Sequence, residues 1–123
     1  MREIKFRVWD NDSKKIYNQD DFILTFDNVG EDIYLKGNNE IIPFYRYKLM
    51  QYTGLEDKNG QEIYEGDILD YGTYGKFEVV WHRGSFKIRK LGFKNGNLHY
   101  LGDCYFDELM VTGNIYENPE LLG

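Results

Sequence analysis

The sequence predicts a mainly β protein with little helix, and three observations lead to that prediction. The 123 residues contain no alanine, the strongest helix former, but include 11 Tyr, 8 Phe and 2 Trp, which suit a pleated, half-buried surface. Short runs alternate apolar and polar residues with the period of two that a strand requires. Clusters of Gly, Asn and Asp separate these runs and mark tight turns.

The N-terminal part of the chain predicts short strands joined by turns. Ile4, Phe6 and Val8 share one face of the first run, which stops at the turn-like segment 10–13. Pro43 limits the last run to a sheet edge or a break, because proline cannot donate a hydrogen bond to a strand ladder. The expected strands are residues 2–9, 14–17, 21–26, 32–36 and 41–42.

The middle of the chain predicts a boundary between two subdomains. Residues 49–66 are interpreted as loop-rich, and 57–60, with the sequence Asp-Lys-Asn-Gly, form a strong tight-turn signal. We therefore expect a β-rich subdomain over residues 1–50 and a second one over residues 51–123.

The sequence of the second subdomain predicts closely spaced strands with glycine at the corners, as in a small barrel or sandwich. The expected strands are residues 67–71, 76–82, 86–91 and 97–101. Residues 103–110 fit either a short helix opened by Asp103 or a strand. Pro119, which follows Asn118, predicts a final helical turn.

Side-chain pairing predicts the register of the hairpin 76–91. Cross-strand aromatic and opposite-charge pairs each contribute about 0.2–1 kcal/mol, and a slip by two residues loses both kinds. The favoured register leaves residues 82–85, or the inner two of them, as the loop, and it buries Trp81 in the core. The predicted pairs are Trp81 with Phe86, Val79 with Ile88, and Glu78 with Arg89.

Three segments of the chain resemble one protein family. They are residues 4–10 (IKFRVWD), 49–69 (LMQYTGLEDKNGQEIYEGDIL) and 113–121 (GNIYENPEL). Together they resemble the YopX family, uncharacterised proteins that phages and prophages encode. The resemblance implies a mostly β protein whose second half is a small barrel of the Src-homology-3 type, and it implies no activity.

Residues that could support catalysis are better interpreted as structural. Glu62, Glu65 and Asp67 lie in a turn-and-strand motif that needs no chemistry to explain it. His82 and His99 lack metal-ligand spacing, and no nucleophile signature accompanies them. Asp103 disfavours a thiolate at the neighbouring Cys104. We expect no enzyme, no metal and no cofactor.

The acidic pairs in the sequence do not change that expectation. Paired carboxylates support hydrolysis or metal binding only when the fold brings them together in a cleft, which adjacency does not establish. Asp10-Asn11-Asp12-Ser13 is similar to the start of a calcium loop, but it lacks the glycine and the distal glutamate of that motif. A turn is the favoured interpretation.

Charge is unevenly distributed along the chain. The net charge is -6, whereas residues 76–94 carry six basic side chains against Glu78. A cationic hairpin with exposed Lys87 and Arg89 is one way to hold a phosphate backbone. The candidate binding residues are Arg83, Lys87, Arg89 and Lys90. Acidic segments flank this hairpin on both sides, so nucleic-acid binding is the alternative hypothesis rather than the favoured one.

The favoured hypothesis is a non-catalytic binding or accessory module that forms a homo-oligomer and binds an unknown phage or host protein. Its aromatic content supports this, since Tyr and Trp are enriched at interfaces. A single cysteine suits a reducing compartment, and no run approaches 18 consecutive apolar residues. We therefore expect neither export nor membrane insertion, and a location in the cytoplasm of a bacterial host.

Overall fold

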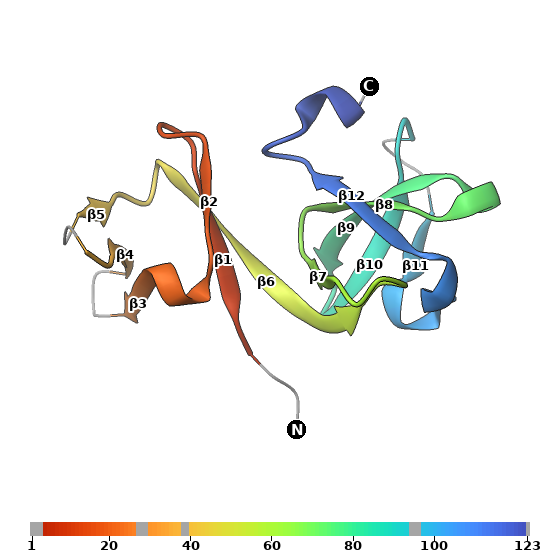
Figure 1. Cartoon of the computed structure of the whole chain (residues 1–123), viewed down its shortest axis with the longest axis horizontal. Coiled ribbons are helices and arrows are strands. Elements are labelled where there is room, and N and C mark those ends of the chain that lie inside the picture. The colour runs from red at the N-terminus through yellow and green to blue at the C-terminus, as the bar shows by residue number, and fades with distance from the viewer. Residues whose placement is uncertain (1–3, 27–29, 38–39, 94–96, 123) are drawn as a thin grey trace. The chain divides into compact units, whose positions relative to one another are not determined.

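The computed structural model describes residues 4–26, 30–37, 40–93 and 97–122. These residues form antiparallel strands joined by turns and by 3-10 helices of three or four residues, with no α-helix in the described ranges (Figure 1). The prediction of a mainly β protein with little helix is confirmed. None of the described helices has the length and apolar character needed to cross a lipid bilayer.

The chain forms two compact units, Lys5–Gln51 and the described residues from Tyr52 onward. In the first unit, two small antiparallel sheets enclose a core of aliphatic and aromatic side chains. The first sheet contains β1 (Phe6–Asp10), β2 (Lys15–Tyr17) and the first half of β6 (Tyr47–Glu56). The second contains β3 (Phe22–Phe26), β4 (Glu31–Leu35) and β5 (Ile41–Ile42). The core residues are Val8, Phe22, Ile33, Leu35, Ile42 and Tyr47.

The turn that follows β1 is organised by its first residue. Asp10 is almost fully buried, and its carboxylate accepts hydrogen bonds from the Asp12 backbone, the Ser13 hydroxyl and the Arg46 guanidinium. These hydrogen bonds hold the acidic segment 10–13 in a turn, in agreement with the interpretation favoured from the sequence.

The expectation of a loop-rich segment over residues 49–66 is wrong. β6 is the longest strand, with ten residues, and it pairs with β7 (Glu62–Tyr64) across the predicted turn 57–60. Met50 and Tyr52 are buried, which is typical of strand residues that face a core. Gly54 has φ +85° and lies where the register with β7 shifts, so it marks an irregularity inside a strand rather than a loop.

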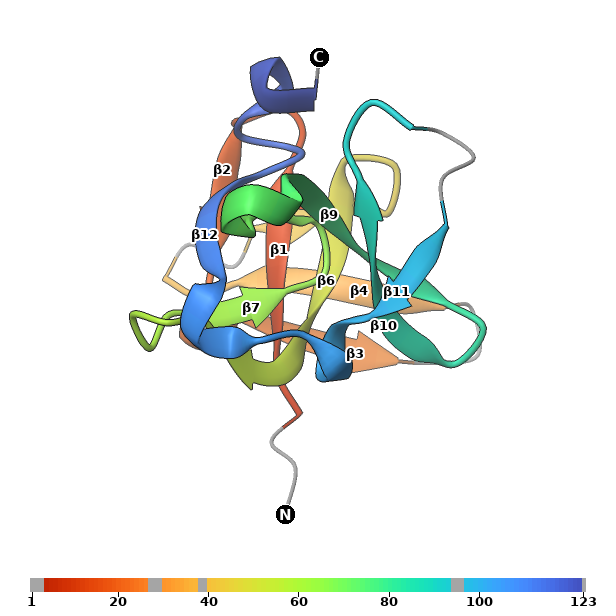
Figure 2. The same ribbon diagram turned by 90° about the vertical axis from the view of Figure 1, so that its right-hand side faces the viewer.

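The second unit contains a five-stranded antiparallel sheet that curls into a half-barrel (Figure 2). Four strands follow one another as a meander, two 3-10 helices come next, and the last strand returns beside the first. In sheet order the strands are β11 (Leu98–Tyr100), β10 (Ser85–Lys90), β9 (Lys76–His82), β8 (Asp67–Asp70) and β12 (Met110–Asn114). The core residues include Ile63, Leu69, Phe77, Val79, Ile88, Leu101 and Leu109.

The β9–β10 hairpin has the predicted register, with Trp81 opposite Phe86, Val79 opposite Ile88, and Glu78 opposite Arg89. Its loop is the inner pair of the predicted four residues. Arg83 and Gly84 have φ values of 50° and 82°, the two positive angles of a type I′ turn.

The predicted burial of Trp81 is wrong. The side chain is 48% exposed, although its ring packs edge-on against Phe86 with centroids 4.8 Å apart. Trp81 lies one residue before the end of β9, beyond the buried Val79, so it extends past the part of the sheet that the core covers.

Residues 103–110 are neither a continuous helix nor a strand. Two 3-10 helices, Leu101–Asp103 and Phe106–Glu108, precede β12, a strand that sequence patterning did not identify. The predicted final helical turn is present as the 3-10 helix Pro119–Leu122.

Candidate functional site

The four predicted binding residues lie in different surroundings in the structure. Arg83 occupies the exposed hairpin turn, and Lys90 is exposed at the end of β10. Arg89 forms an ion pair with Glu78, at 3.1 Å between Nη2 and Oε1. The hairpin therefore does not present its cations as one group.

Lys87 departs from its predicted exposure. Its side chain is buried, only 9% of the residue being accessible, and Nζ donates a hydrogen bond of 2.8 Å to the backbone oxygen of His82. The same ammonium lies 5.2 Å from the ring centroid of Tyr100, which stands opposite Lys87 on β11. Cation–π attraction to this ring supplements the hydrogen bond and holds the ammonium against the strand.

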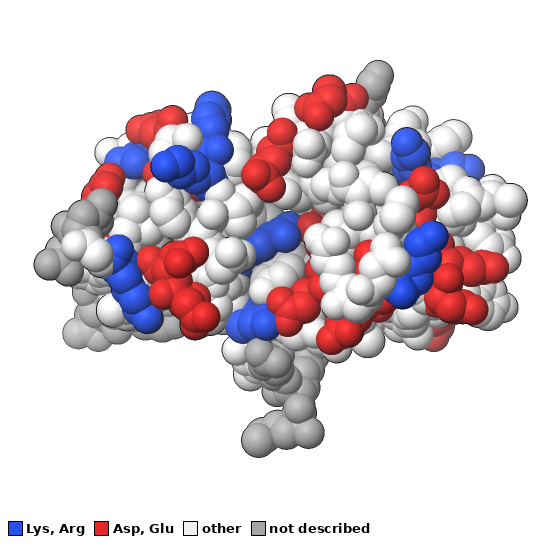
Figure 3. Space-filling view, viewed as in Figure 1, with Lys and Arg blue, Asp and Glu red and all other residues white. Residues whose placement is uncertain are grey.

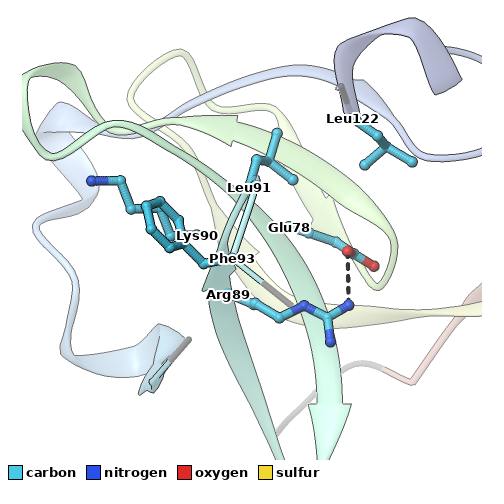
Figure 4. A pocket seen from close by; sticks show the side chains of 7 residues that line it. Glu78, Arg89, Lys90, Leu91, Phe93 and Leu122 are labelled. Atoms are coloured by element: carbon cyan, nitrogen blue, oxygen red, sulfur yellow. Dashed lines mark hydrogen bonds and ion pairs between the residues drawn. The ribbon is translucent and has the colours of Figure 1, made fainter. Parts of the chain in front are cut away.

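Basic and acidic side chains are interspersed on the face of the molecule drawn in Figure 3. The cavity beside the Glu78–Arg89 ion pair shows the same mixture at short range (Figure 4). This cavity, of about 520 Å³, is also lined by Leu91, Phe93 and Leu122. Lys90 lines it as well, so its charges are Arg89 paired with Glu78 on the adjacent strand and one further cation.

A second hollow, on the same unit, is lined mainly by aromatic rings. Two cavities of about 390 Å³ each share Tyr74, Phe77 and His99 in their walls, so they adjoin each other. We call the two cavities together the aromatic groove. The rings that line it belong to Tyr71, Tyr74, Phe77, Phe93 and Tyr100.

The groove has a buried floor and an exposed rim. Phe77 and Ile88 belong to the barrel core, and both line the groove from below. Tyr74, Phe93 and Tyr100 are 51%, 58% and 56% exposed, so half or more of each residue faces solvent. A concave, largely apolar site with a few polar groups is the usual form of a ligand-binding site.

The rim at Tyr74 is shaped by the short loop between β8 and β9. The backbone N–H of Tyr71 donates to the Gly75 oxygen at 2.8 Å, which closes the loop around the 3-10 helix Gly72–Tyr74. The backbone N–H of Tyr105 donates to the Tyr71 hydroxyl at 2.7 Å. Two chain segments distant in sequence are thereby fixed on one side of the groove.

Cys104, which lines the groove, is poorly suited to nucleophilic chemistry. Burial raises the pKa of the thiol, the negative charge of Asp103 raises it further, and the hydrogen bond with Tyr71 only partly offsets them. The thiol lies 3.8 Å from the backbone oxygen of Tyr100, to which it donates. A protonated thiol is a weak nucleophile, so the group contributes polarity rather than reactivity.

The conspicuous acids of the segment 49–69 have structural partners. The carboxylate of Asp57 accepts hydrogen bonds from the backbone N–H groups of Asn59, Gln61 and Val111, each at 2.9 Å. Asp67 accepts one from the Tyr64 backbone at 2.8 Å. Among the described residues, no three His, Cys, Asp or Glu side chains are grouped to hold a metal ion.

Sequence reasoning did not identify the aromatic groove. A signal for part of it was present in Tyr71-Gly72-Thr73-Tyr74-Gly75, where glycines hold two tyrosines in a tight loop. The other walls come from β9, β10, β11 and the segments on either side of β11, and their meeting depends on how the sheet curls.

Comparison with known proteins places the chain among proteins of similar fold. A family model described as "YopX protein" matches residues 5–123. The crystal structure of protein EF1440 from Enterococcus faecalis is similar over 100% of both chains, with 30% identity and a TM-score of 0.67. The crystal structure of protein yopX from Bacillus subtilis is similar over 100% of both chains, with 22% identity and a TM-score of 0.68. No curated protein matches the chain.

Proposed function

Starting from the fact that the chain belongs to the YopX protein family, we propose that it is a non-catalytic binding module, encoded by a phage or prophage. It acts in the cytoplasm of the bacterial host and uses the aromatic groove to hold a phage or host protein. The module also forms a homo-oligomer.

The observation that carries this proposal is the exposure of the groove's rim. Tyr74, Phe93 and Tyr100 keep half or more of their area in water around a floor that reaches the core. Leaving large rings exposed forgoes about 25 cal/mol for each Å² of apolar area, and a partner that covers them recovers that free energy. Tyrosine is enriched at protein interfaces for this reason.

The alternative function, nucleic-acid binding by the hairpin 76–94, receives less support. The Lys87 ammonium is hydrogen-bonded to the His82 backbone, and the Arg89 guanidinium is paired with Glu78. Lys87 is also buried, and the Glu78 carboxylate balances the charge of Arg89, so both cations attract a phosphate less than free ones would. Arg83 and Lys90 are the more accessible of the four predicted binding residues.

Quantitative affinity capture from phage-infected cells tests the proposed function. We compare the wild-type chain with Tyr74→Ser and with Tyr105→Ser as a matched control, since Tyr105 is 62% exposed on the same unit but does not line the groove. We expect Tyr74→Ser to lose proteins that Tyr105→Ser retains. Identical capture by all three chains would refute the groove as the binding surface.

A further inference from the structure

We propose that the aromatic groove accepts an extended segment of a partner protein, which pairs with the outer edge of β11 and inserts one apolar side chain. This inference rests on the proposed function and specifies the chemistry of the partner. The inserted side chain is flanked by a basic and an acidic residue.

The edge of β11 is the first reason. β11 ends the five-stranded sheet, and within the described residues it pairs with β10 alone. Successive strand residues point to opposite faces, yet Leu98, His99 and Tyr100 all line the same cavity. A cavity along the outer edge of β11 accounts for this lining, because residues of both faces reach the edge of a strand. An exposed edge is a template for an added strand.

The floor of the groove is the second reason. His99 stands opposite Ile88 in the ladder, so the two side chains share a face, but Ile88 is buried and His99 is exposed. The inner face of the sheet is thus buried at β10 but exposed to solvent at β11. A strand added there would place alternate side chains over this face, and the cavity of about 390 Å³ beside Phe77 has room for one large apolar group.

Charge at the two ends of the groove is the third reason. Asp103 lies just beyond the C-terminal end of β11 and lines one of the two cavities. Lys90 lines the other cavity together with Asn97, the residue just before the N-terminal end of β11. Both charged residues are exposed. A complementary segment carries a basic residue toward Asp103 and an acidic one toward Lys90. An antiparallel segment has the order basic, apolar, acidic, and a parallel one has the reverse.

The first test uses a display library of random dodecapeptides selected on the full chain. The strongest binder is synthesised, and each backbone N–H is replaced in turn by N-methyl. We expect N-methylation at alternate residues to weaken binding about tenfold or more, and at the intervening residues to leave it unchanged, because alternate N–H groups of a strand face its neighbour. Slowed hydrogen exchange of backbone amides in β11 should accompany binding.

A second test uses variants of the chain with the same peptide. Tyr74→Ala should lower the affinity, whereas Tyr105→Ala should not. Asp103→Lys should weaken binding about two- to fivefold, and exchanging the peptide's basic residue for Glu should restore it. Asp107→Lys is the matched control, since Asp107 is exposed but lies outside the groove.

The outcomes separate this inference from the proposed function. A Tyr74-sensitive peptide without the alternating N-methyl pattern would overturn strand pairing and leave the groove as a binding surface. Peptides that bind Tyr74→Ala as well as the wild type would overturn both. A library that yields no Tyr74-sensitive binder, while a thymidine oligonucleotide binds in a Tyr74-dependent way, would replace the peptide with nucleic acid.

Discussion

A single carboxylate, that of Asp57, connects two parts of the second unit. Asp57 directly follows β6, and its carboxylate accepts hydrogen bonds from the N–H groups of Asn59 and Gln61 in the turn. It also accepts one from the N–H of Val111 in β12. Burial raises the pKa of this carboxyl, but the hydrogen bonds from Val111, Gln61 and Asn59 lower it more, so the net pKa lies below its usual value. The charged form is therefore the one that stabilises the fold.

Replacing Asp57 with Asn should destabilise the protein by about 1.5–3 kcal/mol at neutral pH, the range for hydrogen bonds to a charged group. The folded-state pKa is lowered, so this stabilisation is complete above the unfolded pKa of about 4 and is lost as pH falls through the folded pKa. Urea unfolding at several pH values should show the difference between wild type and Asp57→Asn shrinking on acidification. An undiminished difference at low pH, or an equal effect of the exposed-site control Asp107→Asn, would contradict this.

The exposure of Trp81 changes the expected result of its replacement. A large aromatic core residue costs about 3–5 kcal/mol on truncation to Ala, but Trp81 is half exposed and retains mainly its contact with Phe86. We expect Trp81→Ala to cost about 1–2 kcal/mol, and Ile88→Ala, at a residue 1% exposed, about 2–5 kcal/mol. Chemical unfolding of both variants should show the larger loss for Ile88→Ala. The reverse order would place the barrel core elsewhere.

These residues show what sequence could and could not predict. The Glu78–Arg89 pair and the hairpin register were predictable because cross-strand pairing depends only on positions along two adjacent strands. The exposure of Trp81 and the burial of Lys87 were not, because each depends on where the curled sheet is covered. The aromatic groove depends on the same curl of the sheet, so it could not be predicted from the sequence either.

At the scale of elements, tight turns were easier to predict than long strands. The turn 57–60 was identified from its Asp-Lys-Asn-Gly sequence, whereas β6 was missed because Gly54 interrupts its pattern. Leu101, at the start of the first 3-10 helix before β12, and Leu109, just after the second, are both buried, and their separation of eight residues fits a strand face as well as a helix face. Periodicity therefore left the segment 103–110 unresolved.

The β9–β10 turn allows a direct test of backbone strain. Gly84 has φ +82°, and a Cβ added there would contact nothing within 4 Å, so Gly84→Ala should cost about 1–2 kcal/mol through the backbone alone. Gly102 provides a matched control, because an added Cβ there also meets nothing and its φ lies outside the left-handed region. Thermal or urea unfolding should therefore show a loss for Gly84→Ala and little change for Gly102→Ala. Equal effects would be inconsistent with a type I′ turn.

At the scale of the whole molecule, we predict self-association. β11 and β12 end the barrel sheet, and β3 and β5 end the small sheet of the first unit, so strand edges are available in both units. Exposed aromatic residues occur in both as well, including Phe44 at 77% and Trp81 at 48%. Edges and apolar surface of this kind favour pairing between copies, most often with closed symmetry.

Sedimentation at tens of micromolar, about the range of moderate self-affinity, should show a species heavier than the 14.7 kDa chain. A strict monomer at that concentration would contradict the prediction. Adding the peptide selected on the groove then identifies the edge involved. If copies pair through β11, saturating peptide should dissociate the oligomer, because peptide and second copy compete for the same backbone groups. If another edge is used, the oligomer should persist with peptide bound, and the groove would remain open to a partner in the assembled state.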